Sequence, residues 1–269
     1  MPSVTTNDGV RLCYQDAGSG RPLVIAPGIA QTASMFVHQV EGLRDRYRVI
    51  AYDHRGHGES DRPPHGYRIA RLAKDLDDLL ESLDLADVTL LGWSMGCQVA
   101  WSYYDLFGPK RMSRLILVDG TVFMCRTPEM TSEDVAGTGA VWDAAGAVAA
   151  IDGLRSNPEA AVRQLVSSFL TEKYADEDWL VGEILKMPAE AAATLMFDHV
   201  FGDWRDVISR ITIPTLIVGA TRSHVPLSVH EWLNHTVPGS KLAVLRDRAH
   251  LMFYEEPDTF NELVADFMG

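Results

Sequence analysis

Short apolar runs alternate with helical periodicity over the first 120 residues, and this alternation is the strongest constraint on the fold. Strands buried on both faces are nearly continuous in apolar residues, which is typical of a parallel sheet covered by helices. Helical spacing of apolar residues separates the runs, as in repeated strand–helix–strand units. An α/β fold is therefore predicted, with strands at 10–15, 23–26, 48–52, 88–91 and 114–118.

The sequence pattern changes after Thr121 and changes back near residue 208. Residues 124–207 are rich in Ala, Met and acidic side chains and contain no convincing strand. Strand patterns return at 214–218 and 241–245, and a last amphipathic helix follows. We expect one sheet domain, built from residues 1–123 and 208–269, with residues 124–207 inserted as a helical lid.

A candidate nucleophile lies in the sequence Gly92-Trp93-Ser94-Met95-Gly96, which has the form G-x-S-x-G. It directly follows the expected strand 88–91 and precedes a helical segment, which is the context that this motif requires. The glycines leave room for a serine held at a strained backbone angle. That strain lifts the hydroxyl above the sheet, at the positive end of the next helix. Ser94 is therefore the expected nucleophile.

Three features together resemble the α/β-hydrolase superfamily: the Ser94 turn, the loop Asp53–Ser60 and the late His250. The resemblance covers the whole chain. It implies an α/β-hydrolase fold with a mostly parallel eight-stranded sheet, flanking helices and the helical lid after the sixth strand. It also implies that His250 is the base, and that the backbone N–H groups of Ile29 and Met95 stabilise an oxyanion.

One loop departs from the superfamily pattern. Most relatives have His-Gly where this chain has Pro27–Gly28. The missing histidine normally organises the loop and takes no part in the reaction. Its absence is therefore expected to affect the shape of the loop more than the mechanism. The Asp53–Ser60 loop is expected to be mostly structural.

The acid that should orient His250 is absent from its usual place. In most relatives it follows the seventh strand, but here the loop 219–226 contains no carboxylate. Asp119 follows the expected strand 114–118, at the sheet edge that borders the site in an open parallel sheet. A minority of the superfamily places its acid there, and in this respect the chain is similar to zearalenone lactonases and cofactor-independent quinolone dioxygenases. We expect Asp119 to complete the triad and Ser223→Ala to cost little; the alternative is that Asp119 only caps its loop.

Serine in place of aspartate at the turn argues against epoxide hydrolysis and hydrolytic dehalogenation. We expect cleavage of a carboxylic ester or lactone of a mainly apolar small molecule through an acyl-serine. The alternatives are a cofactor-independent dioxygenase with a His–Asp dyad, a perhydrolase or haloperoxidase activity, and a ligand receptor without catalysis. Lid aromatics serve either as lid core or as pocket lining, and the expected pocket residues are Trp93, Phe123, Trp142, Trp179, Trp204, His38 and His199.

The numbers of charged residues limit the kinds of partner that the protein is expected to bind. There are 24 Lys and Arg residues against 37 Asp and Glu, for a formal net charge of −13. Such a surface repels phosphate backbones and anionic lipids, so no nucleic-acid or membrane partner is expected. Three scattered cysteines fit a reducing compartment, and the first residues do not resemble a signal peptide. We expect a cytoplasmic enzyme with no metal or cofactor, and a homodimer remains an open alternative to a monomer.

Overall fold

The computed structural model describes residues 1–171 and 177–269. Within this part, an eight-stranded sheet has the order β1-β2-β4-β3-β5-β6-β7-β8. β2 pairs antiparallel with β1 and β4, and every other neighbouring pair is parallel. The expected mostly parallel sheet is therefore confirmed. The strands are β1 (Ser3–Thr5), β2 (Arg11–Ala17), β3 (Pro22–Ala26), β4 (Arg48–Tyr52), β5 (Val88–Trp93), β6 (Met112–Val118), β7 (Thr215–Ala220) and β8 (Lys241–Leu245).

The seven expected strands agree with the structure to within two residues at each end. β3, β5 and β7 are buried at every position, because helices cover both faces of the sheet. β1 was not expected. It is three residues long and buries only Val4, which is too short a pattern to read as a strand.

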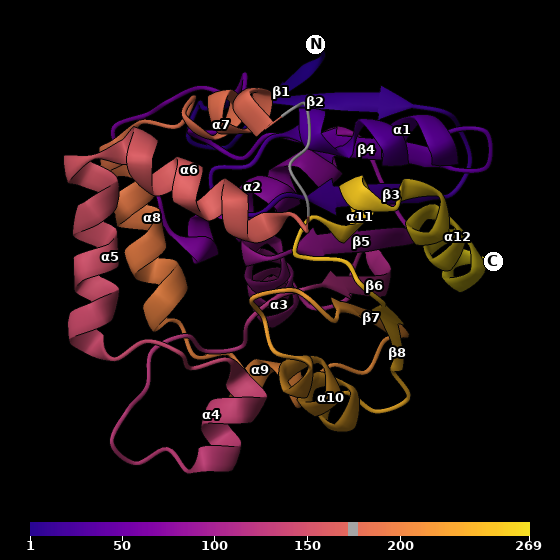
Figure 1. Ribbon diagram of the computed structural model, residues 1–269. Helices are drawn as coiled ribbons and strands as arrows, with labels where there is room; N and C mark the ends of the chain where they lie inside the picture. Colours follow the sequence, from indigo (N-terminus) through magenta and orange to yellow (C-terminus); the bar gives the residue numbers. More distant parts are fainter. Residues whose placement is uncertain (172–176) are drawn as a thin grey trace.

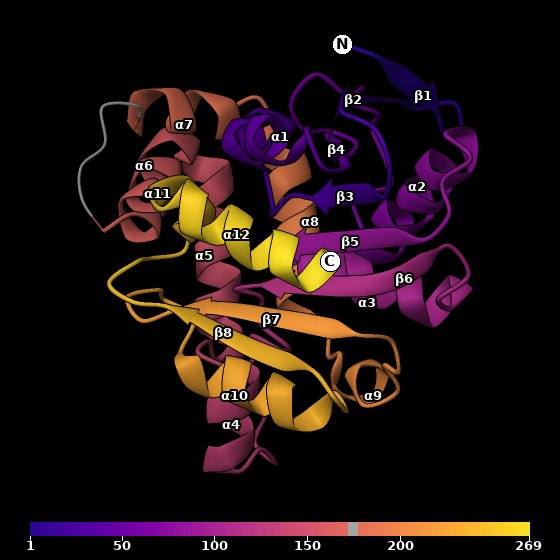
Figure 2. The same cartoon turned by 90° about the vertical axis from the view of Figure 1, so that its right-hand side faces the viewer.

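Helices cover the two faces of the sheet. α1 (Val37–Leu43) and α12 (Pro257–Met268) pack on each other on one face, in front of the strands in Figure 2. α2 (Ile69–Ser82) and α3 (Met95–Phe107) pack together on the other face. α10 (Leu227–Thr236) lies against β7, and short turns η1 (Ala33–Phe36) and α11 (Met252–Glu255) flank α1. The loops after β5, β6, β7 and β8 therefore meet at one edge of the sheet.

The segment between β6 and β7 is helical where it is described. α5, α6, α7 and α8 gather beside the sheet, whereas α4 packs on α10 (Figure 1). None of the described helices has the length and apolar character needed to span a membrane. The helices are α4 (Ser132–Thr138), α5 (Ala144–Ser156), α6 (Pro158–Phe169), α7 (Glu177–Ile184), α8 (Ala189–Phe201) and α9 (Arg205–Ile208).

Candidate active site

Ser94 occupies the turn between β5 and α3 in a strained backbone conformation, with φ 55° and ψ −120°. Such angles are rare for a residue with a side chain and persist only where the surroundings enforce them. The two flanking glycines are required, because a Cβ at Gly96 would collide with the carbonyl of Ala26 and one at Gly92 with Gly96. Ser94 is partly exposed while its neighbours in β5 and α3 are buried. The turn thus presents the hydroxyl at the end of the sheet.

Asp119 lies next to this turn. The N–H of Ser94 donates to the carbonyl of Val118, and the N–H of Asp119 donates to Val218, each over 2.9 Å. Asp119 also has a positive φ of 49°. Two neighbouring strands therefore end in residues with the same kind of strained turn, and the carboxylate and the hydroxyl emerge at the same edge.

His250 follows β8 and contacts that carboxylate. Its Nδ1 lies 2.6 Å from Oδ2 of Asp119, and both side chains are almost completely buried. Among the described residues nothing hydrogen-bonds to its Nε2, although this atom is buried. A carboxylate on Nδ1 fixes the tautomer in which Nε2 is free to accept a proton. The structure thus brings Asp119 and His250 together, 131 residues apart in sequence.

The carboxylate of Asp119 has two further partners. Ser223 Oγ donates to Oδ2, and His230 Nε2 lies 2.9 Å from Oδ1. Burial alone would raise the pKa of Asp119, but its contacts with His230 and His250 outweigh burial and lower that pKa to about 2. The 219–226 loop has no carboxylate, but its Ser223 helps to hold the carboxylate of Asp119. The expectation that Ser223 plays little part does not fit this contact.

The loop after β3 lies beside Ser94. A Cβ at Gly28 would lie 3.1 Å from the Cβ of Ser94, so the absence of a side chain lets the loop approach. Ile29 is the next residue, and Met95 begins α3. Among the described residues, no acceptor pairs with the backbone N–H of Ile29 or Met95. Both N–H groups are therefore free for an oxyanion.

The Asp53–Ser60 loop contacts the loop that contains Ile29 through three polar contacts. Ala30 donates its N–H to His57 Nε2 over 2.9 Å, Ala33 donates to Asp53 Oδ1 over 2.7 Å, and His54 Nε2 lies 3.2 Å from the carbonyl of Pro27. Burial lowers the pKa of His57 to about 4, so its ring is neutral and can accept. These hydrogen bonds hold the loop in place, although Pro27 stands where most relatives have the histidine that organises it.

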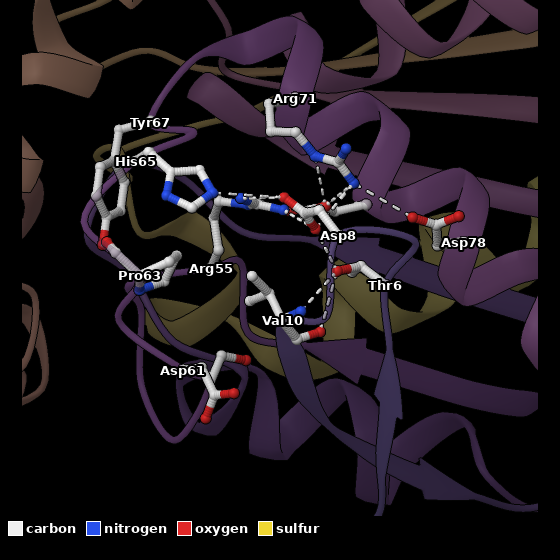
Figure 3. Close-up of polar contacts among 12 residues, drawn as sticks. Thr6, Asp8, Val10, Arg55, Asp61, Pro63, His65, Tyr67, Arg71 and Asp78 are labelled. Carbon is white, nitrogen blue, oxygen red and sulfur yellow. Dashed lines mark hydrogen bonds and ion pairs between the residues drawn. The ribbon is translucent and has the colours of Figure 1, made fainter.

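Arg55 anchors the same loop to the core (Figure 3). Its fully buried guanidinium pairs with Asp75 over 2.6 Å and with Asp8 over 2.9 Å. Arg71 extends this network to Asp75 and Asp78. Such a bidentate, hydrogen-bonded set satisfies the buried charges. These contacts give the loop a structural part.

The expected pocket residues lie in different surroundings. Trp93 is fully buried; its Nε1 donates to the carbonyl of His250 over 3.0 Å, and its ring centroid lies 4.8 Å from that of His250. It therefore packs against His250 from inside the core. His38 is exposed on α1 beside Tyr254, and Trp179 is 40% exposed on α7. Both side chains are solvent-exposed, and neither lines the cavity beside Ile29.

The remaining expected pocket residues belong to the inserted segment and its flanks. Phe123 is buried in a small cluster against which Trp142 packs, apart from the main core. Trp204 packs toward Trp101 and lines a surface opening beside α2 and α8. His199 is buried on α8, and burial and the nearby His250 lower its pKa to about 4. Of these residues, His199 is close enough to His250 for the charge of one ring to affect the other.

Phe169 was missing from the expected site. Its ring centroid lies 4.6 Å from that of His250 and it stacks on His224 at 5.5 Å. Its position at the end of a helix with no motif gave no signal beyond its aromatic character. His230 gave no signal either, since a lone histidine on an amphipathic helix is usually structural.

A small apolar cavity adjoins the Ile29 loop. It has a volume of about 30 Å³ and is lined mainly by aliphatic side chains, not by the expected aromatics. A larger opening of about 710 Å³ lies between residues 62–71 and 188–194, away from Ser94, Asp119 and His250. The cavity by Ile29 is lined by residues that include Leu154, Val162, Met187, Ala192 and Met196.

Comparison with known proteins identifies the family to which this fold belongs. A family model described as alpha/beta hydrolase fold matches residues 21–257, so the chain belongs to the α/β-hydrolase family. It is 41% identical over 119 residues to a non-heme chloroperoxidase of Kitasatospora aureofaciens, covering 44% of this chain and 43% of that protein. It is 27% identical over 267 residues to 3-oxoadipate enol-lactonase 2 of Acinetobacter baylyi, covering 98% and 95%. A solved esterase of Exiguobacterium antarcticum has a TM-score of 0.88 at 26% identity, covering 99% of each chain.

Proposed function

We propose that the protein is a serine hydrolase that cleaves a carboxylic ester or lactone of a mainly apolar small molecule through an acyl-serine. The contact that carries the proposal is His250 Nδ1 to Asp119 Oδ2 at 2.6 Å, with Nε2 left free beside a strained Ser94 turn. The esterase and enol-lactonase relatives support the same class of reaction.

Each group has a defined role in the proposed mechanism. His250 Nε2 takes the proton of Ser94 Oγ as the oxygen attacks the carbonyl carbon, and Asp119 stabilises the imidazolium that forms. The N–H groups of Ile29 and Met95 donate to the oxyanion. His250 then protonates the leaving alcohol, and water repeats the sequence to release the acid.

The apolar side chains around the cavity by Ile29 favour an uncharged substrate, and this cavity of about 30 Å³ must widen to admit more than one or two water-sized groups. Its lining offers shape and apolar surface but no charged side chain next to Ile29, so an aliphatic part of the substrate is favoured over a sugar or a phosphate. A panel of p-nitrophenyl esters and of lactones, assayed with the unmodified protein and with Ser94→Ala, tests the proposal. Activity that disappears in Ser94→Ala supports it, and activity that survives contradicts it.

A second candidate is perhydrolysis, favoured by the chloroperoxidase relative. Hydrogen peroxide would replace water as the second nucleophile, so that the acyl-serine gives a peracid and free Ser94. The peracid would then oxidise halide outside the site. Peracid formation from an acetate ester and peroxide, lost in Ser94→Ala, tests this candidate.

A further inference from the structure

His230 contacts the carboxylate that faces His250, and it comes from α10, outside the elements that carry the proposed triad. Its Nε2 lies 2.9 Å from Oδ1 of Asp119, and both side chains are fully buried. His250 and Ser223 contact the other oxygen, Oδ2. The two oxygens of Asp119 therefore have separate neighbours. Among the described residues, His230 Nε2 is the polar atom that approaches Oδ1, at a distance of 2.9 Å but without the alignment of a full hydrogen bond.

The fold makes room for this ring. A Cβ at Gly219 would lie 2.8 Å from ring atoms of His230, so β7 approaches α10 only because residue 219 has no side chain. His230 is fixed between Gly219 and Asp119 as a result. Its Nδ1 has no partner among the described residues, so a protonated ring would bury an unpaired donor. The neutral tautomer with its proton on Nε2 avoids that cost and places the proton on the side of the ring that lies next to Asp119.

We infer that His230 is a positioning residue that holds Asp119 for His250, so that the site uses four linked groups: Ser94, His250, Asp119 and His230. This inference rests on the proposed function. Without His230, Oδ1 would be a buried charged oxygen with no partner, and the carboxylate would be free to rotate away from His250 Nδ1. The positive end of the His230 N–H also stabilises the ionised form of Asp119.

Other titratable groups face the same pair. His199 approaches from α8, His224 from the loop after β7, and Cys97 from α3. Burial and His250 lower the pKa of both histidines, and burial raises that of Cys97. All three are therefore neutral near pH 7.

The test measures the rate at which a p-nitrophenyl alkylphosphonate labels Ser94, as a function of pH, without knowledge of the substrate. In His230→Leu, which cannot donate, we expect a plateau rate lower by roughly 10- to 100-fold, the worth of one hydrogen bond to a charged group. We also expect the acid limb to move to higher pH, because removing a positive N–H from Asp119 makes His250 harder to deprotonate. His230→Gln restores a donor and should recover most of the rate and the original limb.

The matched control is His235→Leu, an exposed histidine on the same helix, which should leave rate and profile unchanged. If His230→Leu does not fold, Gly219→Ala displaces the ring without removing it, and we expect the same slow labelling. The inference is overturned if the variant that folds is labelled at the original rate with the original profile. It is also overturned if His230→Gln and His230→Leu lose rate equally with the same acid limb. An unmodified protein that is not labelled would overturn the proposed function itself.

Discussion

Leu251 donates its backbone N–H to the carbonyl oxygen of Phe169 over 3.0 Å, which fastens the end of α6 to the loop that carries His250. Glu255 strengthens this connection. Its Oε1 accepts from the N–H and the hydroxyl of Thr171, each over 2.6 Å, and its Oε2 accepts from the N–H of Ala249 over 2.7 Å. The end of α6 and the His250 loop are thus held together by this backbone hydrogen bond and by the carboxylate of Glu255.

Replacement of Glu255 by Gln should loosen this connection. The amide NH₂ of glutamine faces a donor on one side, so at least one of the three hydrogen bonds is lost. We expect turnover to fall about 10-fold, equivalent to one charged hydrogen bond, and the melting temperature to fall by a few degrees. Glu262→Gln, on the exposed side of α12, is the control. Equal behaviour of the two variants in an ester assay and a thermal melt would contradict the role of Glu255.

Asp119→Asn keeps the shape of the side chain but removes its charge. The amide favours the wrong tautomer of His250, and we expect turnover to fall by roughly 10²–10⁴-fold, the upper figure being the known protease case. Ser223→Ala removes a donor from the same carboxylate and should cost about 10-fold. A steady-state assay with circular dichroism measures both effects. A fully active Asp119→Asn variant would show that another group orients His250.

Stability should fall as the pH is lowered through the acid range. Burial lowers the pKa of His57 to about 4 from the usual 6.5, so below about pH 6.5 the unfolded chain binds a proton that the folded chain refuses. The contribution is complete above pH 6.5 and is lost progressively toward pH 4, at about 1.4 kcal/mol per pH unit. His57→Gln keeps an acceptor for the Ala30 N–H but does not titrate. Urea unfolding at several pH values should show a shallower slope for this variant, and an unchanged slope would be evidence against a neutral buried His57.

The aliphatic cavity by Ile29 should control substrate size. Ala192 is buried in its wall, and the side chain introduced by Ala192→Phe is larger than this space of about 30 Å³, so it prevents the cavity from widening, and rates on long-chain p-nitrophenyl esters should fall relative to the acetate by at least 10-fold. Trp179→Ala changes an exposed aromatic and should leave the ranking unchanged. If Trp179→Ala alters the ranking and Ala192→Phe does not, the pocket lies elsewhere.

Sequence patterns predicted the parts of this fold that depend on local chemistry. Strands such as 48–52 and 241–245 were predicted at their observed bounds, because apolar runs and turns mark them directly. The pairing of His250 with Asp119 was predicted because the 219–226 loop lacks a carboxylate. The first inference needed only residue types and their order along the chain, whereas the second also used the resemblance to the α/β-hydrolase superfamily.

Contacts between elements that are far apart in the sequence were harder to predict. Nothing in the sequence says that His230 approaches Asp119, since this depends on the close packing of α10 on Gly219. Trp93 looked like a pocket residue because it adjoins Ser94, but alternation in β5 turns its ring into the core beneath His250. The exposure of His38 and Trp179 was equally inaccessible, because the orientation of a helix decides which of its residues are exposed.

We expect Ser94 to become covalently modified during catalysis, with His250 and Asp119 as its activating pair. The most direct test is intact-protein mass spectrometry after exposure to a p-nitrophenyl alkylphosphonate, followed by peptide mapping of the adduct. We predict one adduct on Ser94, formed slowly in Asp119→Asn and absent in Ser94→Ala. An unlabelled protein that still hydrolyses esters, or an adduct on another residue, would contradict the account.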